Sequence, residues 1–280
     1  MSSPAASINS SINSSINSSI NPSINPSSVS STLDSLKKNK PVYQAAVYIG
    51  VCGLIILLIV IIKNLIVYIY TQKMRKPWLI KGSKDAKKSL VIAQDPADPN
   101  SVPLNRSDNE SGGTEFTYSL WFVVDNFVYN KDKWKHIFHK GNNPPYPNRA
   151  PGVYLHPNKN SLRIYMNTYE KILEFIDVDN IPVRKWIHLG IVLKEKILDV
   201  YVNGLLKKRH IFDSLPRQNF GDVWINLNGG FEGYISKMRY FQYALNYNDI
   251  ENIVNDGPSD DTCGGDKDLP GYLNDKWWLK

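Results

Sequence analysis

The stretch that decides the fold is WIHLGIVLKEKILDVYVNG, residues 186–204. It contains two apolar runs, Trp186–Leu193 and Ile197–Val202, and it ends in Asn203-Gly204 before a third run, Leu206–Phe212. Short runs of this composition are typical of β-strands. Asn-Gly between two such runs indicates a two-residue hairpin turn, because both turn positions need positive φ. The stretch therefore predicts three successive antiparallel strands.

Short apolar runs of the same kind extend over most of the C-terminal two thirds of the chain. Phe116–Val124 alternates between two faces, with Phe116, Tyr118, Leu120 and Phe122 on one of them. The remaining predicted strands are Lys135–Lys140, Val153–His156, Leu162–Asn167, Ile172–Val178, Val223–Asn228 and Tyr234–Tyr240. Asn248–Val254 is the one predicted helix. Many short strands with a single helix predict an all-β domain, a two-sheet antiparallel sandwich over residues 113–256.

A different feature precedes this domain. Ala45–Ile62 is eighteen residues without a charge. Started at Val42, a helix to Ile62 is about 31 Å long at roughly 1.5 Å per residue, which is enough for a bilayer core. A buried core helix is disfavoured because the run has no polar face. A cleaved signal peptide is disfavoured because the run starts far into the chain and no small-residue cleavage site follows. Residues 42–70 are therefore predicted to be a signal-anchor, a single transmembrane helix.

The charge of the chain is concentrated beside that helix. The chain has 33 Lys+Arg and 26 Asp+Glu, a net charge of +7, but residues 37–88 hold eleven basic residues and one acid. Residues 89–280 hold 22 basic and 24 acidic residues. The basic flanks suit anionic lipid headgroups and do not support nucleic-acid binding. More positive charge follows the helix than precedes it, so the positive-inside rule predicts a cytosolic C-terminal domain.

The rest of the chain falls into tails and a linker. Residues 1–36 repeat Ser, Asn and Ile in a four-residue unit interrupted by Pro, and are predicted to be a disordered low-complexity tail. Asn9, Asn13 and Asn17 there, and Asn105 and Asn109 later, lie in Asn-x-Ser sequons. Residues 71–112 are predicted to be a juxtamembrane basic linker and a connector that begins with a short strand at residue 89. Residues 257–280 form a C-terminal tail with the pair Trp277 and Trp278. Cys52, in the apolar run, and Cys263, near the C-terminus, are not expected to pair.

Five ordered motifs resemble one known superfamily. They are residues 115–121 (EFTYSLW), 137–141 (IFHKG), 186–192 (WIHLGIV), 198–204 (LDVYVNG), and 231–240 followed by Ala244-Leu245. In this order they resemble the concanavalin A-like jelly-roll superfamily and its laminin-G-like branch, with Ile187 where a His is usual. The resemblance implies a jelly-roll fold. It leaves function open, because that superfamily includes lectins, glycoside hydrolases and adhesion modules.

A narrower resemblance concerns the layout of the whole chain. A short tail, one span, Asn105-Arg106-Ser107 before the domain, and the ending Pro270 to Trp278 resemble membrane-anchored proteins of large DNA viruses. This resemblance implies a virion membrane or an internal membrane of the host cell.

Catalytic and metal-binding patterns are not found in the sequence. The related hydrolases use Glu-x-Asp-x-x-Glu on one strand, and the nearest acids here, Glu170, Glu174, Asp177 and Asp179, have the wrong types and spacing. We therefore expect no catalytic residue and no enzyme activity. His136 and His139 are three apart on a predicted strand and so should face opposite ways. His188 is expected to be structural. Calcium is the one cofactor that the superfamily suggests, but its ligands cannot be assigned.

The candidate ligand site is the loop GNNPPYPNRAP, residues 141–151. Its side chains Asn142, Asn143, Tyr146, Asn148 and Arg149 combine amide and guanidinium donors with an aromatic ring, which suits sugar hydroxyls and a sugar face. A rigid Pro-rich loop without a ligand is the alternative. The basic run Lys207–His210 is predicted to be a solvated edge strand, with contact to anionic glycans, phosphates or a membrane as the other interpretation.

These features predict a single-pass membrane-anchored, lectin-like binding module that recognises glycan or protein without catalysis. The alternative is a structural virion-membrane scaffold with no sugar site. A β-glucan-hydrolysing glycosidase is a third and weaker interpretation.

Overall fold

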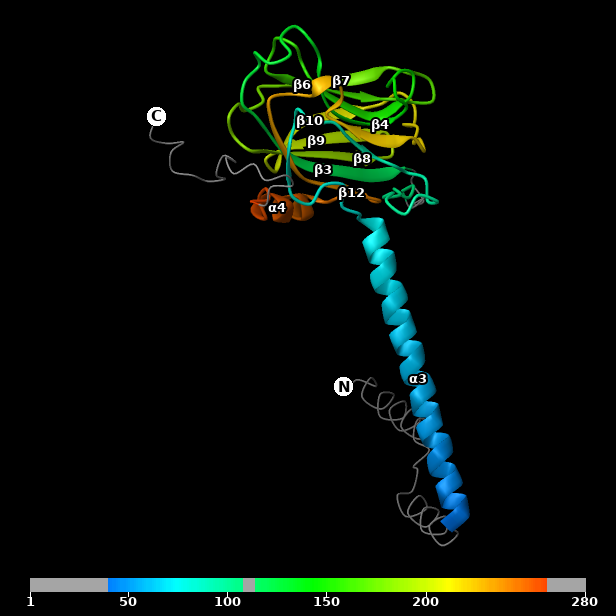
Figure 1. The fold of residues 1–280 in the computed structure, drawn as a ribbon. Helices are drawn as coiled ribbons and strands as arrows, with labels where there is room; N and C mark the ends of the chain where they lie inside the picture. The colour runs from blue at the N-terminus through cyan, green and yellow to red at the C-terminus, as the bar shows by residue number, and fades with distance from the viewer. Residues whose placement is uncertain (1–39, 108–113, 261–280) are drawn as a thin grey trace, which may run out of the picture. The chain divides into compact units, whose positions relative to one another are not determined.

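The computed structural model describes residues 40–107 and 114–260 of the chain (Figure 1). The predictions for the tail of residues 1–36, for Asn109, for Cys263 and for Trp277 and Trp278 lie outside these residues. The described chain belongs to two compact units that divide between Tyr68 and Ile69. Each unit is described by itself.

The first unit contains most of helix α3 (Lys40–Arg75), which runs past both ends of the predicted span of 42–70. Its apolar side chains are exposed, and no residue of the helix is buried. Length and composition make it the one helix in the described residues that is able to cross a membrane. Cys52 lies on it as an exposed free thiol.

The second unit is a sandwich of two six-stranded antiparallel sheets, which confirms the predicted fold class. Sheet A has the order β1 (Ser83–Asp85), β12 (Gly233–Phe241), β3 (Glu115–Val124), β8 (Ile187–Lys194), β9 (Ile197–Val202) and β10 (Leu205–Ile211). Sheet B has the order β2 (Leu90–Ile92), β11 (Asp222–Ile225), β4 (Lys135–Gly141), β5 (Arg149–Leu155), β6 (Ser161–Met166) and β7 (Glu174–Asp179). The hairpin between β9 and β10 turns at Asn203 and Gly204, whose φ angles of 51° and 80° are the positive values that Asn-Gly predicts.

The core between the sheets is built by alternation along the strands. On β3, Phe116, Tyr118, Leu120 and Phe122 belong to the main hydrophobic cluster. The opposite face of β3 is also buried, because Trp121 and Val123 pack with Trp186 in a separate cluster. The predicted alternation is therefore correct, but neither face of this central strand is left to solvent.

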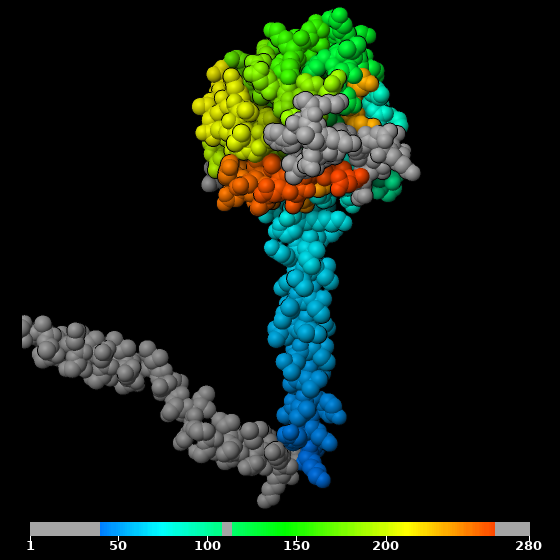
Figure 2. All heavy atoms as spheres, turned by 90° about the vertical axis from the view of Figure 1, so that its left-hand side faces the viewer, coloured from blue at the N-terminus to red at the C-terminus, as the bar shows by residue number. Residues whose placement is uncertain are grey.

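Helix α4 (Tyr247–Asn255) covers part of the outer face of sheet A (Figures 1 and 2). Its Ile250 packs with Val192 of β8 and Phe241 of β12. Asn246 and Asp249 form a capping box at its N-terminus, each side chain accepting from the other's backbone N–H. This part of the outer face of sheet A is thereby covered, whereas the rims of the sandwich carry its open loops.

Two short strands lie upstream of the predicted domain start at residue 113. β2 is the short strand that the sequence predicts after residue 89, whereas β1 is not predicted. Leu79, Ile80, Ala86 and Ile92 all belong to the main core cluster. Residues assigned from sequence to the basic linker are therefore partly structural, because alternating apolar residues among lysines complete one edge of each sheet.

The prediction that His136 and His139 face opposite ways is wrong. The register of β4 against β5 shifts between His136 and Phe138. The bulge directs both Ile137 and Phe138 to the core, so the two histidines lie on the same outer face. An extra residue in one strand reverses the alternation that a regular strand would keep.

Two predicted strand boundaries also differ. The strand predicted over Val223–Asn228 stops at Ile225, because Asn226 and Asn228 take positive φ and the chain enters the short helix η1 (Leu227–Gly229). The strand predicted to start at Val153 starts at Arg149, which pairs with Gly141 of β4. Arg149 is therefore a strand residue and not a loop residue.

Candidate functional site

An open groove of about 540 Å³ lies at one rim of the sandwich. We call it the amide groove, because five of its lining side chains are amides. Its lining residues are Arg106, Asn142, Pro147, Asn148, Asn167, Thr168, Ile172, Arg217, Gln218, Asn219, Phe220 and Gly221. They come from the connector before β3, the β4–β5 loop, the β6–β7 turn and the segment before β11. Its size falls in the range of small-ligand sites.

Asn167 joins these segments into one surface. Its Oδ1 accepts the backbone N–H of Arg149 at 2.6 Å, and its Nδ2 donates to the carbonyls of Pro147 and Ile172. Its own carbonyl accepts from the backbone N–H of Arg217. The side chain is 6% exposed. One buried amide thus fixes the β4–β5 loop, the β6–β7 turn and the segment before β11 relative to one another.

Two glycines allow the groove segments to approach closely. A Cβ on Gly141 would lie 1.9 Å from the carbonyl oxygen of Asn148, and one on Gly221 would lie 2.4 Å from the carbonyl oxygen of Gly141. The backbone N–H of Asn142 donates to that same Asn148 oxygen and closes the β4–β5 loop. Side chains at these two positions would force the rim apart.

The structure brings only part of the predicted site together. Asn142 and Asn148 line the amide groove. Asn143 and Tyr146 are exposed on the same loop but do not line it. The Arg149 guanidinium lies 3.7 Å above the ring centre of Tyr165, on the outer face of sheet B. It contacts aromatic rings there and does not line the groove.

Sequence reasoning missed Arg106, Asn167, Arg217 and Phe220. Phe220 is 74% exposed, although it is a large apolar residue. The string Pro216-Arg-Gln-Asn-Phe220 has the same mixture of amide, guanidinium and aromatic groups as the predicted loop, and that mixture could have identified it. Nothing in the sequence shows that the two segments meet.

A chain of hydrogen bonds runs along the outer face of sheet B to the groove. The backbone N–H of Leu227 donates to Nδ1 of His136, and His136 Nε2 lies 2.7 Å from Nδ1 of His139. His139 Nε2 lies 2.8 Å from the carbonyl of Asn142. A carbonyl only accepts, so His139 carries its proton on Nε2 and His136 donates to His139. We call this chain the histidine relay, and it is complete only when both rings are neutral.

Electrostatics agree with neutral rings. Burial lowers the pKa of His136 well below its usual value, and the neighbouring His139 and Arg149 lower it further. Burial also lowers the pKa of His139, although its bond to the Asn142 carbonyl works in the opposite direction. The relay therefore holds the Asn142 backbone at the groove as an uncharged structural element.

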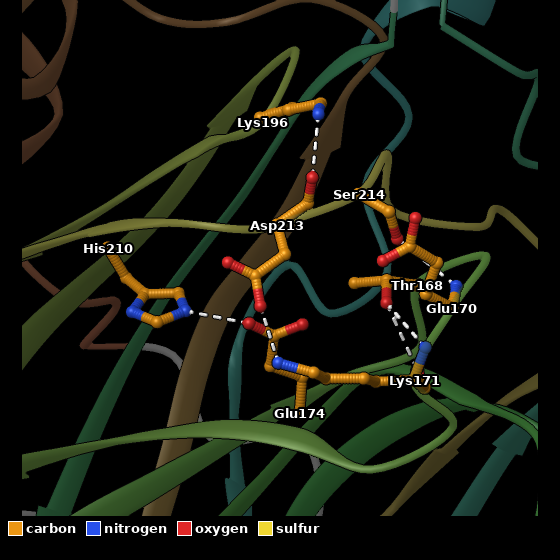
Figure 3. Close-up of polar contacts among 8 residues, drawn as sticks. All are labelled: Thr168, Glu170, Lys171, Glu174, Lys196, His210, Asp213 and Ser214. Carbon is orange, nitrogen blue, oxygen red and sulfur yellow. Dashed lines mark hydrogen bonds and ion pairs between the residues drawn. The ribbon is translucent and has the colours of Figure 1, made fainter.

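Two of the four acids considered for glycoside hydrolysis, Glu174 and Asp177, are paired with basic side chains, whereas Glu170 and Asp179 are exposed. Glu174 Oε1 lies 3.1 Å from His210 Nε2, and Arg163 binds Asp177 through two hydrogen bonds of 2.7 Å. Figure 3 shows that Glu174 and His210 belong to a cluster that also contains Lys171, Lys196 and Asp213. This cluster links the edge strands β7 and β10, where the two sheets meet. Glu170 is exposed there and offers its backbone N–H to Ser214 Oγ.

The basic run Lys207–His210 lies on β10, an edge strand of sheet A, as predicted. Arg209 pairs with Asp199 and His210 with Glu174, while Lys207 and Lys208 are exposed. None of the four lines the amide groove.

In residues 40–107 and 114–260, no group of three or more His, Cys, Asp or Glu side chains is placed to hold a metal ion. The groove contains carbonyl and amide oxygens but no lining carboxylate among those residues. Its chemistry is therefore that of hydrogen-bond donors and acceptors, with two guanidinium groups.

The fold and this groove define a two-sheet, lectin-like sandwich with a polar site at its rim. A family model described as the concanavalin A-like lectin/glucanases superfamily, of the third laminin G type, matches residues 98–251. The chain belongs to this superfamily. The resemblance noted in the sequence is thereby confirmed at the level of the family.

Among solved structures, similar chains are binding domains of botulinum neurotoxins. The receptor binding domain of the C/D mosaic serotype is 13% identical with a TM-score of 0.43, over 51% of this chain and 36% of that chain. The binding domain of type DC, solved in complex with rat synaptotagmin II, is 17% identical with a TM-score of 0.41, over 51% of this chain and 35% of that chain. The match thus spans about a third of those toxin chains. No curated protein matches this chain significantly.

Proposed function

We propose that this protein is a membrane-anchored, non-catalytic binding module that takes a glycan in the amide groove. The observation that carries the proposal is the composition of the groove. Five amides and two guanidinium groups line one open site beside the exposed ring of Phe220. The amides of Asn167 and Asn219 already bond backbone groups of the rim, so Asn142, Asn148 and Gln218 are the amides that face a ligand. Sugars present hydroxyl groups that donate and accept, together with apolar ring faces that pack on aromatic rings.

The contacts of the acidic side chains support the non-catalytic part of the proposal. Retaining and inverting glycosidases both need a pair of free carboxyl groups beside the bound sugar. Asp177 and Glu174 are held by Arg163 and His210, and no described carboxylate lines the groove. These contacts support glycan binding without hydrolysis.

The anchoring part of the proposal rests on α3. Its apolar stretch is flanked by basic residues, which favour anionic lipid headgroups at both ends. We place the protein in a virion membrane or an internal membrane of an infected cell. The support is the short tail, single span and C-terminal string that resemble anchored proteins of large DNA viruses.

A glycan array tests the proposal, using the full chain in non-ionic detergent micelles with and without calcium. We expect a defined set of glycans to bind, equally well with calcium or with a chelator. Gln218→Ala should weaken binding about threefold or more, because it removes one hydrogen-bonding side chain from the groove. Asn158→Ala, in an exposed loop outside the groove, is the matched control.

Two results would contradict the proposal. Hydrolysis of an arrayed β-glucan would show an enzyme. If no arrayed glycan binds and a protein is crosslinked to the sandwich in its native membrane, the structural scaffold would be favoured instead. In that case Gln218→Ala would leave the crosslink unchanged.

A further inference from the structure

The amide groove has an unbalanced charge. Arg106 and Arg217 both line it, and both are exposed. No carboxylate of the described residues lines it, and neither guanidinium forms an ion pair with a described residue. Elsewhere on the same domain, Arg163 and Arg209 each form a bidentate pair with an aspartate. Arg163 and Arg209 are thus neutralised by carboxylates, whereas no described carboxylate pairs with the two arginines in the groove.

Aromatic rings position these two arginines in place of carboxylates. The Arg106 guanidinium lies 4.5 Å from the ring centre of Phe220, and that of Arg217 lies 5.6 Å from the ring centre of Tyr169. Both rings are more than 70% exposed, at 74% and 72%. A cation over a ring face is held in place while its charge and its N–H edge remain available. The two guanidinium groups are therefore in contact with rings and are not neutralised by any carboxylate of residues 40–107 or 114–260.

A third positive charge lies next to the groove. The buried Nζ of Lys140 donates at 2.6 Å to the carbonyl of Gly221, a lining residue. Burial lowers the pKa of Lys140 to about 8, against the opposing effect of Asp222, so the group is still cationic at pH 7. Asp222 itself accepts the backbone N–H of Gln94 and does not line the groove. Lys140 thus adds a third cationic group beside the two lining arginines, and Asp222 offsets part of its charge.

We infer that the glycan taken by the amide groove carries an anionic group, a sugar carboxylate or a sulfate ester, that Arg106 and Arg217 bind. Guanidinium groups match both anions in geometry, and hydrogen bonds between charged partners are about twice as strong as neutral ones. The inference rests on the proposed glycan-binding function and adds the chemical class of the ligand.

The test uses two matched pairs of probes with the full chain in detergent micelles. Trigalacturonate is compared with its methyl ester, and sulfated lactose with lactose, by titration calorimetry. We expect at least one charged probe to bind about tenfold or more tightly than its neutral partner, and to weaken as salt is raised. The pair that shows the difference identifies the anion as carboxylate or sulfate.

A double variant assigns the effect to the two arginines. Arg106→Gln/Arg217→Gln should remove about tenfold or more of the affinity for the charged probe and leave the neutral probe within about twofold. The control variant Lys207→Gln/Lys208→Gln removes an equal number of positive charges from β10, outside the groove. It should change neither the affinity for the charged probe nor that for the neutral probe.

The outcomes separate the inference from the function that it extends. Equal binding of charged and neutral probes, or equal losses in the two double variants, would overturn the inference while glycan binding stands. Binding of neutral array glycans alone would do the same. Failure of every glycan to bind would remove the proposed function, and the inference with it.

Discussion

Asn142 is the residue at which the histidine relay reaches the groove. Its side chain lines the groove, and its carbonyl accepts from the histidine relay. Loop composition predicts Asn142 as a site residue. The relay behind it could not be predicted, because it depends on a bulge that places two histidines of β4 on one face. Short-range composition identifies a polar loop, whereas the support of that loop comes from strand register.

Replacing one ring tests the relay. His139→Phe keeps a similar shape but removes the acceptor of the His136 N–H and the donor to Asn142. A buried donor without a partner costs about 1–3 kcal/mol, so we expect the free energy of unfolding to fall by about that amount. Chemical denaturation of the full chain in detergent measures it. Tyr146→Phe, on the exposed part of the same loop, should stay within about 0.5 kcal/mol of wild type. Equal stabilities of the two variants would count against the relay.

A second histidine makes stability depend on pH. Burial lowers the pKa of His188 to about 4 from an ordinary value near 6.5, and its Nε2 lies 2.9 Å from Ser119 Oγ. The unfolded chain therefore binds this proton more readily than the folded one. Stability attributable to His188 is full above about pH 6.5, falls with pH by about 1.4 kcal/mol per unit, and is gone near pH 4, a total of about 3 kcal/mol.

His188→Gln isolates this contribution. Gln does not titrate, so the difference in the free energy of unfolding between wild type and variant should shrink as pH falls from about 6.5 to 4. His136 and His139 titrate in both proteins and cancel in the difference. Curves that stay parallel over this window would show that His188 is not a buried neutral ring.

At the scale of elements, the strands were predictable and their partners were not. Asn203-Gly204 defines its hairpin from local chemistry alone. β11, in contrast, lies between β2 and β4, segments far from it in sequence, and the segment before β11 brings Arg217 and Phe220 to the rim. No local pattern reports that neighbour relation. This is why only two of the five predicted side chains line the groove. The lining residues Arg106, Asn167 and Arg217 are recognised only from the three-dimensional structure.

The segment just before β1, which contains Ile80, gives a test of where the folded domain begins. Ile80 is 3% exposed in the main core cluster, although it lies in the basic segment. Ile80→Ala should lower the free energy of unfolding by about 2–5 kcal/mol, because it leaves a cavity in the core. Val91→Ala, at a side chain that is 45% exposed on β2, is the control and should cost much less. Similar costs for the two variants would mean that this segment does not complete the sandwich.

For the whole molecule, the sequence predicts the long apolar helix and the β-sandwich better than it predicts the site. A charge-free helical run and a set of short alternating strands are signals that depend only on neighbouring residues. Their separation also shows that the net charge of +7 belongs to the flanks of the helix, since residues 89–280 hold 22 basic and 24 acidic residues. The positive groove of a nearly neutral domain is a local arrangement, and composition could not reveal it.

Topology is the remaining property that charge predicts for the whole chain. Residues between Lys73 and Lys88 carry more positive charge than Lys37, Lys38 and Lys40, so we expect the domain in the cytosol and the tail across the membrane. The tail then receives N-glycans at Asn9, Asn13 and Asn17, whereas Asn105 does not. Translation of the full chain into microsomes measures this as a mass shift that a glycosidase removes.

Two sets of variants decide between the orientations. Replacing the three tail asparagines by Gln should abolish the mass shift, and Asn105→Gln should leave it intact. Added protease should then digest the domain in sealed microsomes and spare the tail. A shift that depends on Asn105 instead would place the amide groove on the glycosylating side of the membrane. Since the positive-inside rule counts flanking charge in short segments and ignores folded domains, that result would mean that translocation of the sandwich outweighs the basic residues beside α3.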